Sequence, residues 1–191
     1  KVTVTWTDGA GETGYTVWRN TVDVSGSATV ISGLLGAGVA TYDDTTATPG
    51  QQYYYWVRGT NSTSTSQSDF STSNAGYRKL PTPAGLAATD GSDLTKVTVT
   101  WTDGAGETGY TVWRNTSDVS GSATVISGLL ASNTVTYDDT TATPGQLYYY
   151  WVRGTNSTST SQSDFSASNS GYRKLTPPTI GAASAIASTS F

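Results

Sequence analysis

A near-exact internal repeat constrains the fold of this chain more than any other feature. Residues 1–80 recur as residues 96–175, offset by 95 positions, and 71 of the 80 positions are identical. Each copy is long enough to bury a core of its own. An active site rarely needs to be present twice, whereas every added structural unit contributes length and the same neighbour contact. The repeat therefore favours a structural or adhesive role.

The repeat also predicts the domain organisation. We expect one unit at residues 1–80, a second at 81–175, and a linker with the beginning of a third unit at 176–191. Residues 81–95 open the second unit and have no counterpart before Lys1, so the first unit lacks its opening segment. We therefore expect the chain to be an excerpt of a longer repeat array.

The hydrophobic pattern predicts strands throughout. Val2, Val4 and Trp6 alternate with threonines, the period of two expected of a half-buried strand. No window has a helical period of any length, and turn residues separate the short apolar runs, which favours an all-β sandwich. The other expected strands of the first unit are one carrying Tyr15 and Val17, then Val39–Tyr42, Gln52–Gly59 and Phe70–Lys79, with Asn61–Gln67 as a loop.

These strands resemble the fibronectin type III domain. The motifs that carry the resemblance are Pro83-x-Gly85-Leu86-x-Ala88, Val97-x-Val99-x-Trp101, Gly109-Tyr110-x-Val112-x-Arg114 and Pro144-Gly145-Gln146-Leu147-Tyr148-x-Tyr150-x-Val152. The resemblance implies two tandem β-sandwiches, the first without its first strand, followed by a C-terminal segment similar to that strand. It also implies a tyrosine-corner role for Tyr148. The chain departs from the family at Ala47 and Ala142, where Leu is usual. Such domains serve as spacers, adhesion modules and enzyme accessories, so the fold alone assigns no role.

Composition excludes several classes of function. The net charge is −4 with only 10 Lys and Arg, which argues against nucleic-acid partners, and no apolar run approaches the length of a membrane span. Because Cys and His are absent, the usual nucleophile–base pairs and zinc or copper sites cannot be built. We therefore predict no enzyme activity, no catalytic residue, no cofactor and no metal site.

Acidic residues are the remaining candidates for metal binding. The pairs Asp43-Asp44 and Asp138-Asp139 are adjacent in sequence, and Asp8 and Glu12 share one loop. None forms the spaced acidic loop that supplies the six to eight oxygens of a calcium site. We interpret Asp43 and Asp44 as solvated strand-end residues.

Alternation along the strands predicts an exposed aromatic face. If Tyr53 and Tyr55 point inward, the intervening side chains point outward and share a sheet face with Trp18. An open patch of large aromatics marks a contact surface, here for another copy of the chain or for surface glycans. The alternative is an internal ladder in which Arg58 stacks on Trp56. The predicted contact face comprises Trp18, Tyr54, Trp56 and Arg58, with Trp113, Tyr149, Trp151 and Arg153 in the second unit.

The missing first strand leaves one sheet edge of the first unit unpaired, and such an edge can accept a strand from another chain. The segment after Pro178 is similar to the opening strand of the second unit, which makes it a candidate donor strand. The alternative is that upstream residues of a longer chain fill the edge. The candidate donor residues are Thr179, Ile180, Gly181, Ala182, Ala183, Ser184 and Ala185.

Together these patterns predict a structural segment of an extracellular or cell-surface fibre, filament or adhesin stalk. Its expected partners are copies of itself or flanking repeats. The competing hypothesis is a carbohydrate-binding, adhesion or enzyme-accessory module that uses the same aromatic residues.

Overall fold

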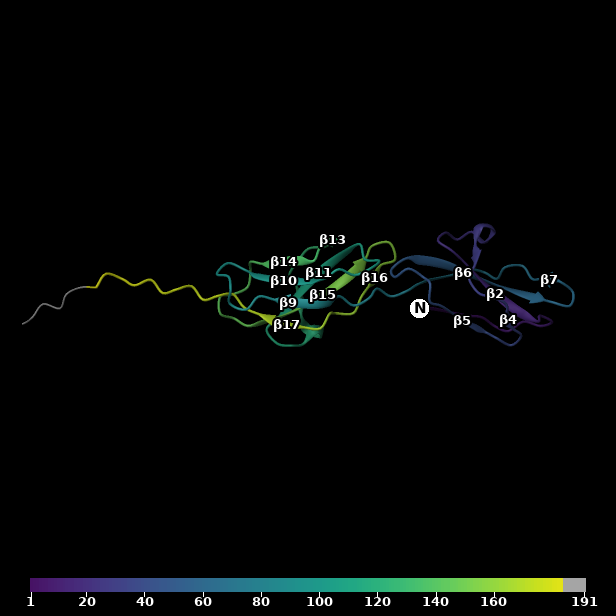
Figure 1. Cartoon of the computed structure of the whole chain (residues 1–191), viewed down its shortest axis with the longest axis horizontal. Helices are drawn as coiled ribbons and strands as arrows, with labels where there is room; N and C mark the ends of the chain where they lie inside the picture. Colours follow the sequence, from purple (N-terminus) through teal and green to yellow (C-terminus); the bar gives the residue numbers. More distant parts are fainter. Residues whose placement is uncertain (184–191) are drawn as a thin grey trace, which may run out of the picture.

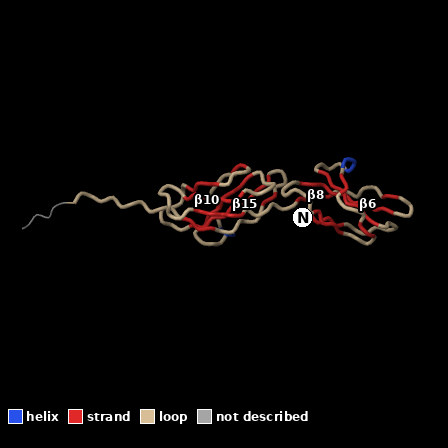
Figure 2. The backbone as a smooth tube through the Cα atoms, in the orientation of Figure 1, coloured by secondary structure: helices blue, strands red, loops and turns tan. Residues whose placement is uncertain are grey.

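The computed structural model describes residues 1–183. Two β-sandwiches lie end to end, and Thr176–Ala183 extend from the far end of the second one (Figure 1). Strands and loops account for almost all of the described chain, and the helical exceptions are short 3₁₀ turns such as η1, Ser25–Ser27, and η2, Ser120–Ser122 (Figure 2). Within residues 1–183 no helix is long and apolar enough to cross a membrane.

The first sandwich packs a two-stranded sheet against a larger one. In the small sheet β1 (Val2–Thr5) pairs antiparallel with β5 (Thr41–Asp44), so that Val4 lies opposite Tyr42. In the large sheet β6 is central, and β2 pairs with it over the whole length of β2. The members of the large sheet are β2 (Gly14–Asn20), β3 (Thr29–Val30), β4 (Leu35–Gly36), β6 (Gln52–Asn61), β7 (Ser66–Gln67) and β8 (Asn74–Tyr77).

The second sandwich repeats this arrangement with one additional strand. Its smaller sheet has three strands in the order β14 (Thr136–Asp139), β10 (Val97–Thr102) and β9 (Ala84–Ala88). Its larger sheet comprises β11 (Gly109–Asn115), β12 (Thr124–Val125), β13 (Leu130–Ala131), β15 (Tyr148–Asn156), β16 (Ser161–Gln162) and β17 (Asn169–Gly171). The strand β9 therefore has no equivalent among the described residues of the first sandwich.

Three predictions about strands differ from the structure. The expected loop Asn61–Gln67 includes strand residues at both ends, since β6 extends to Asn61 and β7 covers Ser66–Gln67. The expected third strand, Val39–Tyr42, is shifted to Thr41–Asp44, and the expected last strand, Phe70–Lys79, is reduced to Asn74–Tyr77. The shortening has a local cause at Ser71. The Ser71 amide donates to the Val57 carbonyl, and the Ser71 hydroxyl accepts from the Val57 amide, so one serine replaces regular pairing beside β6.

Each core consists of inward-facing strand residues. In the first sandwich Tyr15, Val17 and Tyr55 are buried, which confirms the alternation predicted for β2 and β6. Val2 and Val4 of β1 are only half-buried and lie at the border of that core. Their counterparts 95 positions later, which we call their twins, are completely buried because β9 covers them.

Candidate functional site

The predicted aromatic face exists, but part of the chain covers it. Trp18 lies directly opposite Trp56 in the β2–β6 register, as the alternation predicts. Phe70 then packs edge-on against Trp18, with ring centroids 5.3 Å apart. The Arg58 guanidinium lies 4.8 Å above the Phe70 ring, rather than over Trp56 as the ladder alternative expected. Trp18, Phe70 and Arg58 therefore pack against one another within the first sandwich.

This covering makes one prediction wrong. Trp56 is only 4% exposed and its twin Trp151 only 3%, so neither offers an open ring to a sugar or a partner. The segment around Phe70 runs beside β6 without forming a strand, because Ser71 bonds with Val57, and it packs Phe70 against Trp18, the residue opposite Trp56. The second sandwich repeats the arrangement through Phe165, which packs against Trp113 with centroids 5.4 Å apart.

The other predicted face residues are half-buried. Arg153 lies 4.6 Å above the Phe165 ring, the same contact as in the first sandwich. Tyr54, Tyr149, Trp18 and Trp113 keep part of their surface in solvent. The structure thus buries Trp56 and Trp151 and leaves the other six predicted residues partly accessible.

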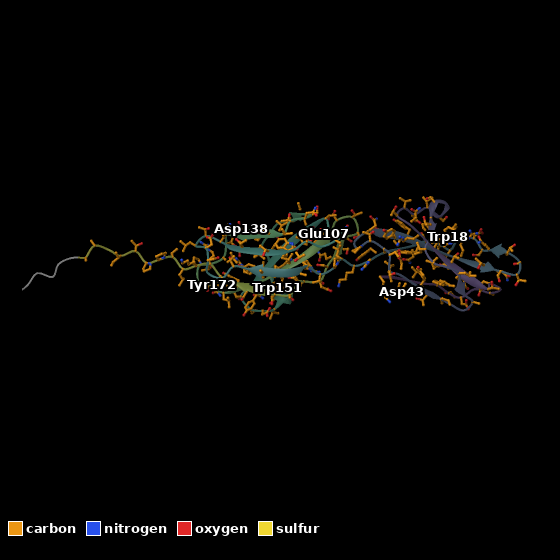
Figure 3. All side chains as sticks on the ribbon, in the orientation of Figure 1. Trp18, Asp43, Glu107, Asp138, Trp151 and Tyr172 are labelled. Carbon is orange, nitrogen blue, oxygen red and sulfur yellow. The ribbon has the colours of Figure 1, made fainter. Side chains whose placement is uncertain are left out.

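The adjacent aspartates have opposite environments. Asp43 is exposed and accepts from Lys1 Nζ at 2.6 Å, and its twin Asp138 pairs with Lys96 in the same way; both lie at the rim of their sandwiches (Figure 3). Asp44 is buried, which corrects its interpretation as a solvated residue. Its place in β5 directs the carboxylate inward, because neighbouring strand residues point to opposite faces.

A network of donors compensates the burial of Asp44. Arg19 Nη1 lies 2.6 Å from Asp44 Oδ2, and the Tyr55 hydroxyl donates to the same oxygen at 3.0 Å. The backbone amide and hydroxyl of Thr46 donate to Oδ1 at 2.9 and 2.8 Å. Burial by itself raises the pKa of Asp44, but the hydrogen bonds from Thr46 and Arg19 outweigh it and hold the pKa below its ordinary value. Asp139 has the equivalent partners in the second sandwich.

These carboxylates have structural roles. Burial and the bond to Asp44 raise the pKa of the Tyr55 hydroxyl, so this tyrosine remains a donor at neutral pH. Among residues 1–183 no cluster of three or more His, Cys, Asp or Glu side chains could hold a metal ion. The Tyr148 hydroxyl contacts Thr143 Oγ1 at 3.3 Å, beside the buried Ala142, so it bonds a side chain at this corner and not the upstream backbone that a tyrosine corner uses.

The junction between the sandwiches is a contact that the sequence pattern did not identify. Leu80 is 4% exposed, whereas its twin Leu175 is 67% exposed. The difference arises because Leu80 lies between the two sandwiches, near Gly50 on one side and Gly154 on the other. Lys79 Nζ also pairs with Asp164 Oδ1 across the junction at 2.7 Å.

The same junction buries the end of the second sandwich. Ser159, Ser161 and Ser163 are buried, while their twins in the loop 64–68 are exposed. Backbone approaches backbone here, since a Cβ placed on Gly106 would collide with the Pro49 carbonyl. Glu107 marks this end of the second sandwich in Figure 3. The sequence feature that could have indicated this junction is Leu80, an apolar residue within a polar and proline-rich linker.

The first sandwich presents the equivalent end surface to solvent as an open cavity of about 440 Å³, which we call the end cavity. Its lining includes Gly11, Gly59 and Asn61, the twins of residues that contact Leu80 or its neighbours. A second depression of about 220 Å³, the edge groove, runs along β1 and is lined by Val2–Thr5, Tyr55 and Asn74–Gly76. No strand among residues 1–183 pairs with this edge of β1.

The candidate donor residues lie at the opposite end of the molecule. Thr179–Ala183 belong to no strand, and the Ile180 side chain is 94% exposed. Ser184 and Ala185 lie outside the described residues.

Comparison with solved structures identifies the architecture. A segment of two fibronectin type III domains from chicken tenascin matches with a TM-score of 0.60 and 16% identity, over 91% of each chain. The fold is a tandem of fibronectin type III-like sandwiches. At this level of identity the likeness extends to the fold alone.

Other solved structures were also found. An Fn3-like protein from Clostridium thermocellum is 29% identical, covering 50% of this chain and 95% of its own, with a TM-score of 0.41. The FN1–FN3 domains of chicken CNTN1 are 17% identical over 91% of this chain and 62% of theirs, with a TM-score of 0.44. No family model and no curated protein matches the sequence.

Proposed function

We propose that this chain is a structural segment of an extracellular fibre, filament or adhesin stalk, and that it acts by holding fibronectin type III-like sandwiches in a stiff row. The observation that carries the proposal is the junction at Leu80. An apolar side chain, an ion pair and close backbone contact are present there, so the two sandwiches are packed against each other as well as tethered.

The link itself opposes bending. Leu80-Pro81-Thr82-Pro83 is short, and each proline fixes its own φ angle and restricts the preceding residue. Gly50 is buried at the junction, while its twin Gly145 at the far end is exposed. Packing and linker chemistry thus support one stiff unit, which suits a role as a spacer.

The extracellular assignment rests on composition and on the fold. The chain is rich in Ser, Thr and Gly, has few charges and has no His or Cys. Its stability depends on neither metals nor disulfides, because each sandwich has a buried core and a buried Arg–Asp–Tyr network. Burial of the strand-central tryptophans favours this structural role over sugar binding.

The experiment compares two glycine substitutions that differ only in their surroundings. Gly106 and Gly11 have nearly the same backbone angle, φ of +85° and +84°, so alanine introduces similar strain at both. A Cβ at Gly106 collides with Pro49, whereas a Cβ at Gly11 has no atom within 4 Å.

We expect small-angle scattering of the dilute wild-type chain and Gly11→Ala to give one elongated rigid particle. Gly106→Ala should broaden the distribution of angles between the sandwiches, and NMR relaxation should then show two bodies that tumble separately. Independent tumbling in the wild type would contradict the proposed function.

A further inference from the structure

The second sandwich shows what the edge groove of the first is shaped to accept. In the second sandwich β9 pairs with β10, Leu86 and Ala88 pack on the core, and Val97 and Val99 are completely buried. In the first sandwich the identical strand β1 has the same side chains half-exposed along the edge groove. The groove is therefore the site that an opening strand occupies in the other copy.

Glycine placement supports this equivalence. A Cβ on Gly171 would lie 2.8 Å from the Ala88 Cβ and 2.9 Å from the Thr89 carbonyl, so bound β9 requires glycine there. A Cβ on the twin Gly76 would lie 3.1 Å from Val2 Cγ1 and 3.7 Å from Tyr55 Cε2, so it would crowd Val2 but would meet no backbone atom. The clash with strand backbone at Gly171 comes only with the bound strand.

The tail, Thr176–Ala183, has the pattern of the strand that fits. Pro177, Ile180 and Ala182 have the same spacing as Pro83, Leu86 and Ala88. The segment from Leu175 to the core-facing Ile180 is one residue shorter than the segment from Leu80 to Leu86. Because the spacing from the proline to the core-facing residue is the same in both segments, the missing residue lies in the link before the proline, which is Leu175-Thr176-Pro177 in the tail and Leu80-Pro81-Thr82-Pro83 at the internal junction.

The two ends of the molecule also match each other, Leu175 at one end and the end cavity at the other. Leu80 fills the space beside Gly154 before the chain enters β9, and Leu175 precedes the tail in the same way while remaining exposed. The end cavity of the first sandwich is lined by twins of the residues around Leu80. In one molecule the tail and β7, whose Ser66 and Gln67 line the end cavity, lie at opposite ends of the long axis (Figure 1), so the tail and the cavity can meet only between copies.

We propose that Leu175 of one copy docks in the end cavity of a second copy and that the following tail adds to β1 as the missing strand, with Ile180 and Ala182 directed into the core. This inference rests on the proposed function, because it extends the internal junction into a contact between chains. The result is a head-to-tail polymer in which every junction repeats the one at Leu80, held without covalent bonds.

A pair of peptides tests the occupant directly. A peptide of residues 81–90 carries the strand known to fit the twin site, and a peptide of residues 176–185 carries the tail. We expect both to bind the 191-residue chain and to alter the fluorescence of the half-buried Trp6. Binding of the first peptide without the second would show that another segment, such as upstream residues of a longer chain, fills the groove, and would overturn the inference.

Matched variants test the assembly. Ile180→Asp removes the core-facing side chain of the tail, and Gly76→Val occupies the groove. Burial of an isoleucine changes affinity by about tenfold or more. Sedimentation velocity over a concentration series should show at least this loss of association for both variants. The controls, Leu129→Asp at an exposed leucine outside the edge groove and Gly36→Ala with the alanine found at its twin, should associate as the wild type does.

Rigid wild-type monomers that remain unassociated at every concentration would overturn the inference and leave the stiff row intact. Fibres by electron microscopy that persist in Ile180→Asp would also overturn it. Sandwiches that tumble independently would instead contradict the proposed function, whether or not copies of the chain associate. Failure of the inference and failure of the proposed function can therefore be told apart.

Discussion

Replacing Leu80 with alanine should weaken the junction by a predictable amount. The twin Leu175 supplies the reference, because the same residues precede it in sequence but no sandwich follows it among residues 1–183. Exposure falls from 67% at Leu175 to 4% at Leu80, a difference of 63 percentage points, which is about two-thirds of the residue surface. Burying a whole leucine contributes about 1.5–3 kcal/mol, so the junction gains about 1–2 kcal/mol from this side chain.

The assay is equilibrium unfolding in guanidinium, followed by tryptophan fluorescence at a dilution where the chain is monomeric. Unfolding of either sandwich breaks the junction, so the loss should appear in the first transition. We expect Leu80→Ala to lower that unfolding free energy by about 1–2 kcal/mol and Leu175→Ala to change it by less than about 0.5 kcal/mol. Equal effects of the two variants would refute the reasoning that Leu80 couples the sandwiches.

Two further predictions concern the buried carboxylates. Asp139→Ala should destabilise the second sandwich by about 3–5 kcal/mol because it leaves Arg114 without its partner, whereas Asp138→Ala should cost less than about 1 kcal/mol in the same urea titration; similar costs would contradict the network's role. The pKa values of Asp44 and Asp139 are lowered in the folded state, so the stability they contribute is complete above their ordinary pKa of 3.8 and is lost as the pH falls through the folded values. Urea titrations from pH 6 down to about 2.5 should therefore show stability falling mainly below about pH 4, and a flat profile there would argue against the lowered pKa values.

The architecture could be predicted from sequence because it depends on features of short range. The alternation around Val2 and along Gln52–Gly59 set the inward faces, and the structure confirms them at Tyr15, Val17 and Tyr55. The Pro144–Gly145 turn likewise precedes β15, the strand expected to begin near Tyr148. These patterns need no knowledge of distant contacts.

The exposure of the aromatic face could not be predicted in the same way. Alternation places Trp56 on the outer face, but it does not predict that Phe70 returns to pack against Trp18, the residue opposite Trp56. That return depends on a single serine, Ser71, which bonds with Val57 fourteen positions earlier. Periodicity within one strand carries no information about such a contact.

The buried carboxylates illustrate a similar limit. Asp43 and Asp44 are identical in type and adjacent, yet one lies in solvent and the other in the core. Donors from Arg19 and Tyr55 on other strands, together with Thr46, make the inward position tolerable. The burial of Leu80 could not be predicted from sequence either, because it depends on the second sandwich being packed against the first.

The junction joins unlike surfaces, a proline–glycine corner with Leu80 on one side and the Gly106 and Asn156 loops on the other. A contact between unlike surfaces is not self-complementary, so two copies cannot satisfy it by facing each other symmetrically. The molecule therefore has two chemically different ends, one with Leu175 and one with the end cavity. Fixing either end to a support orients the whole row and decides which end points outward.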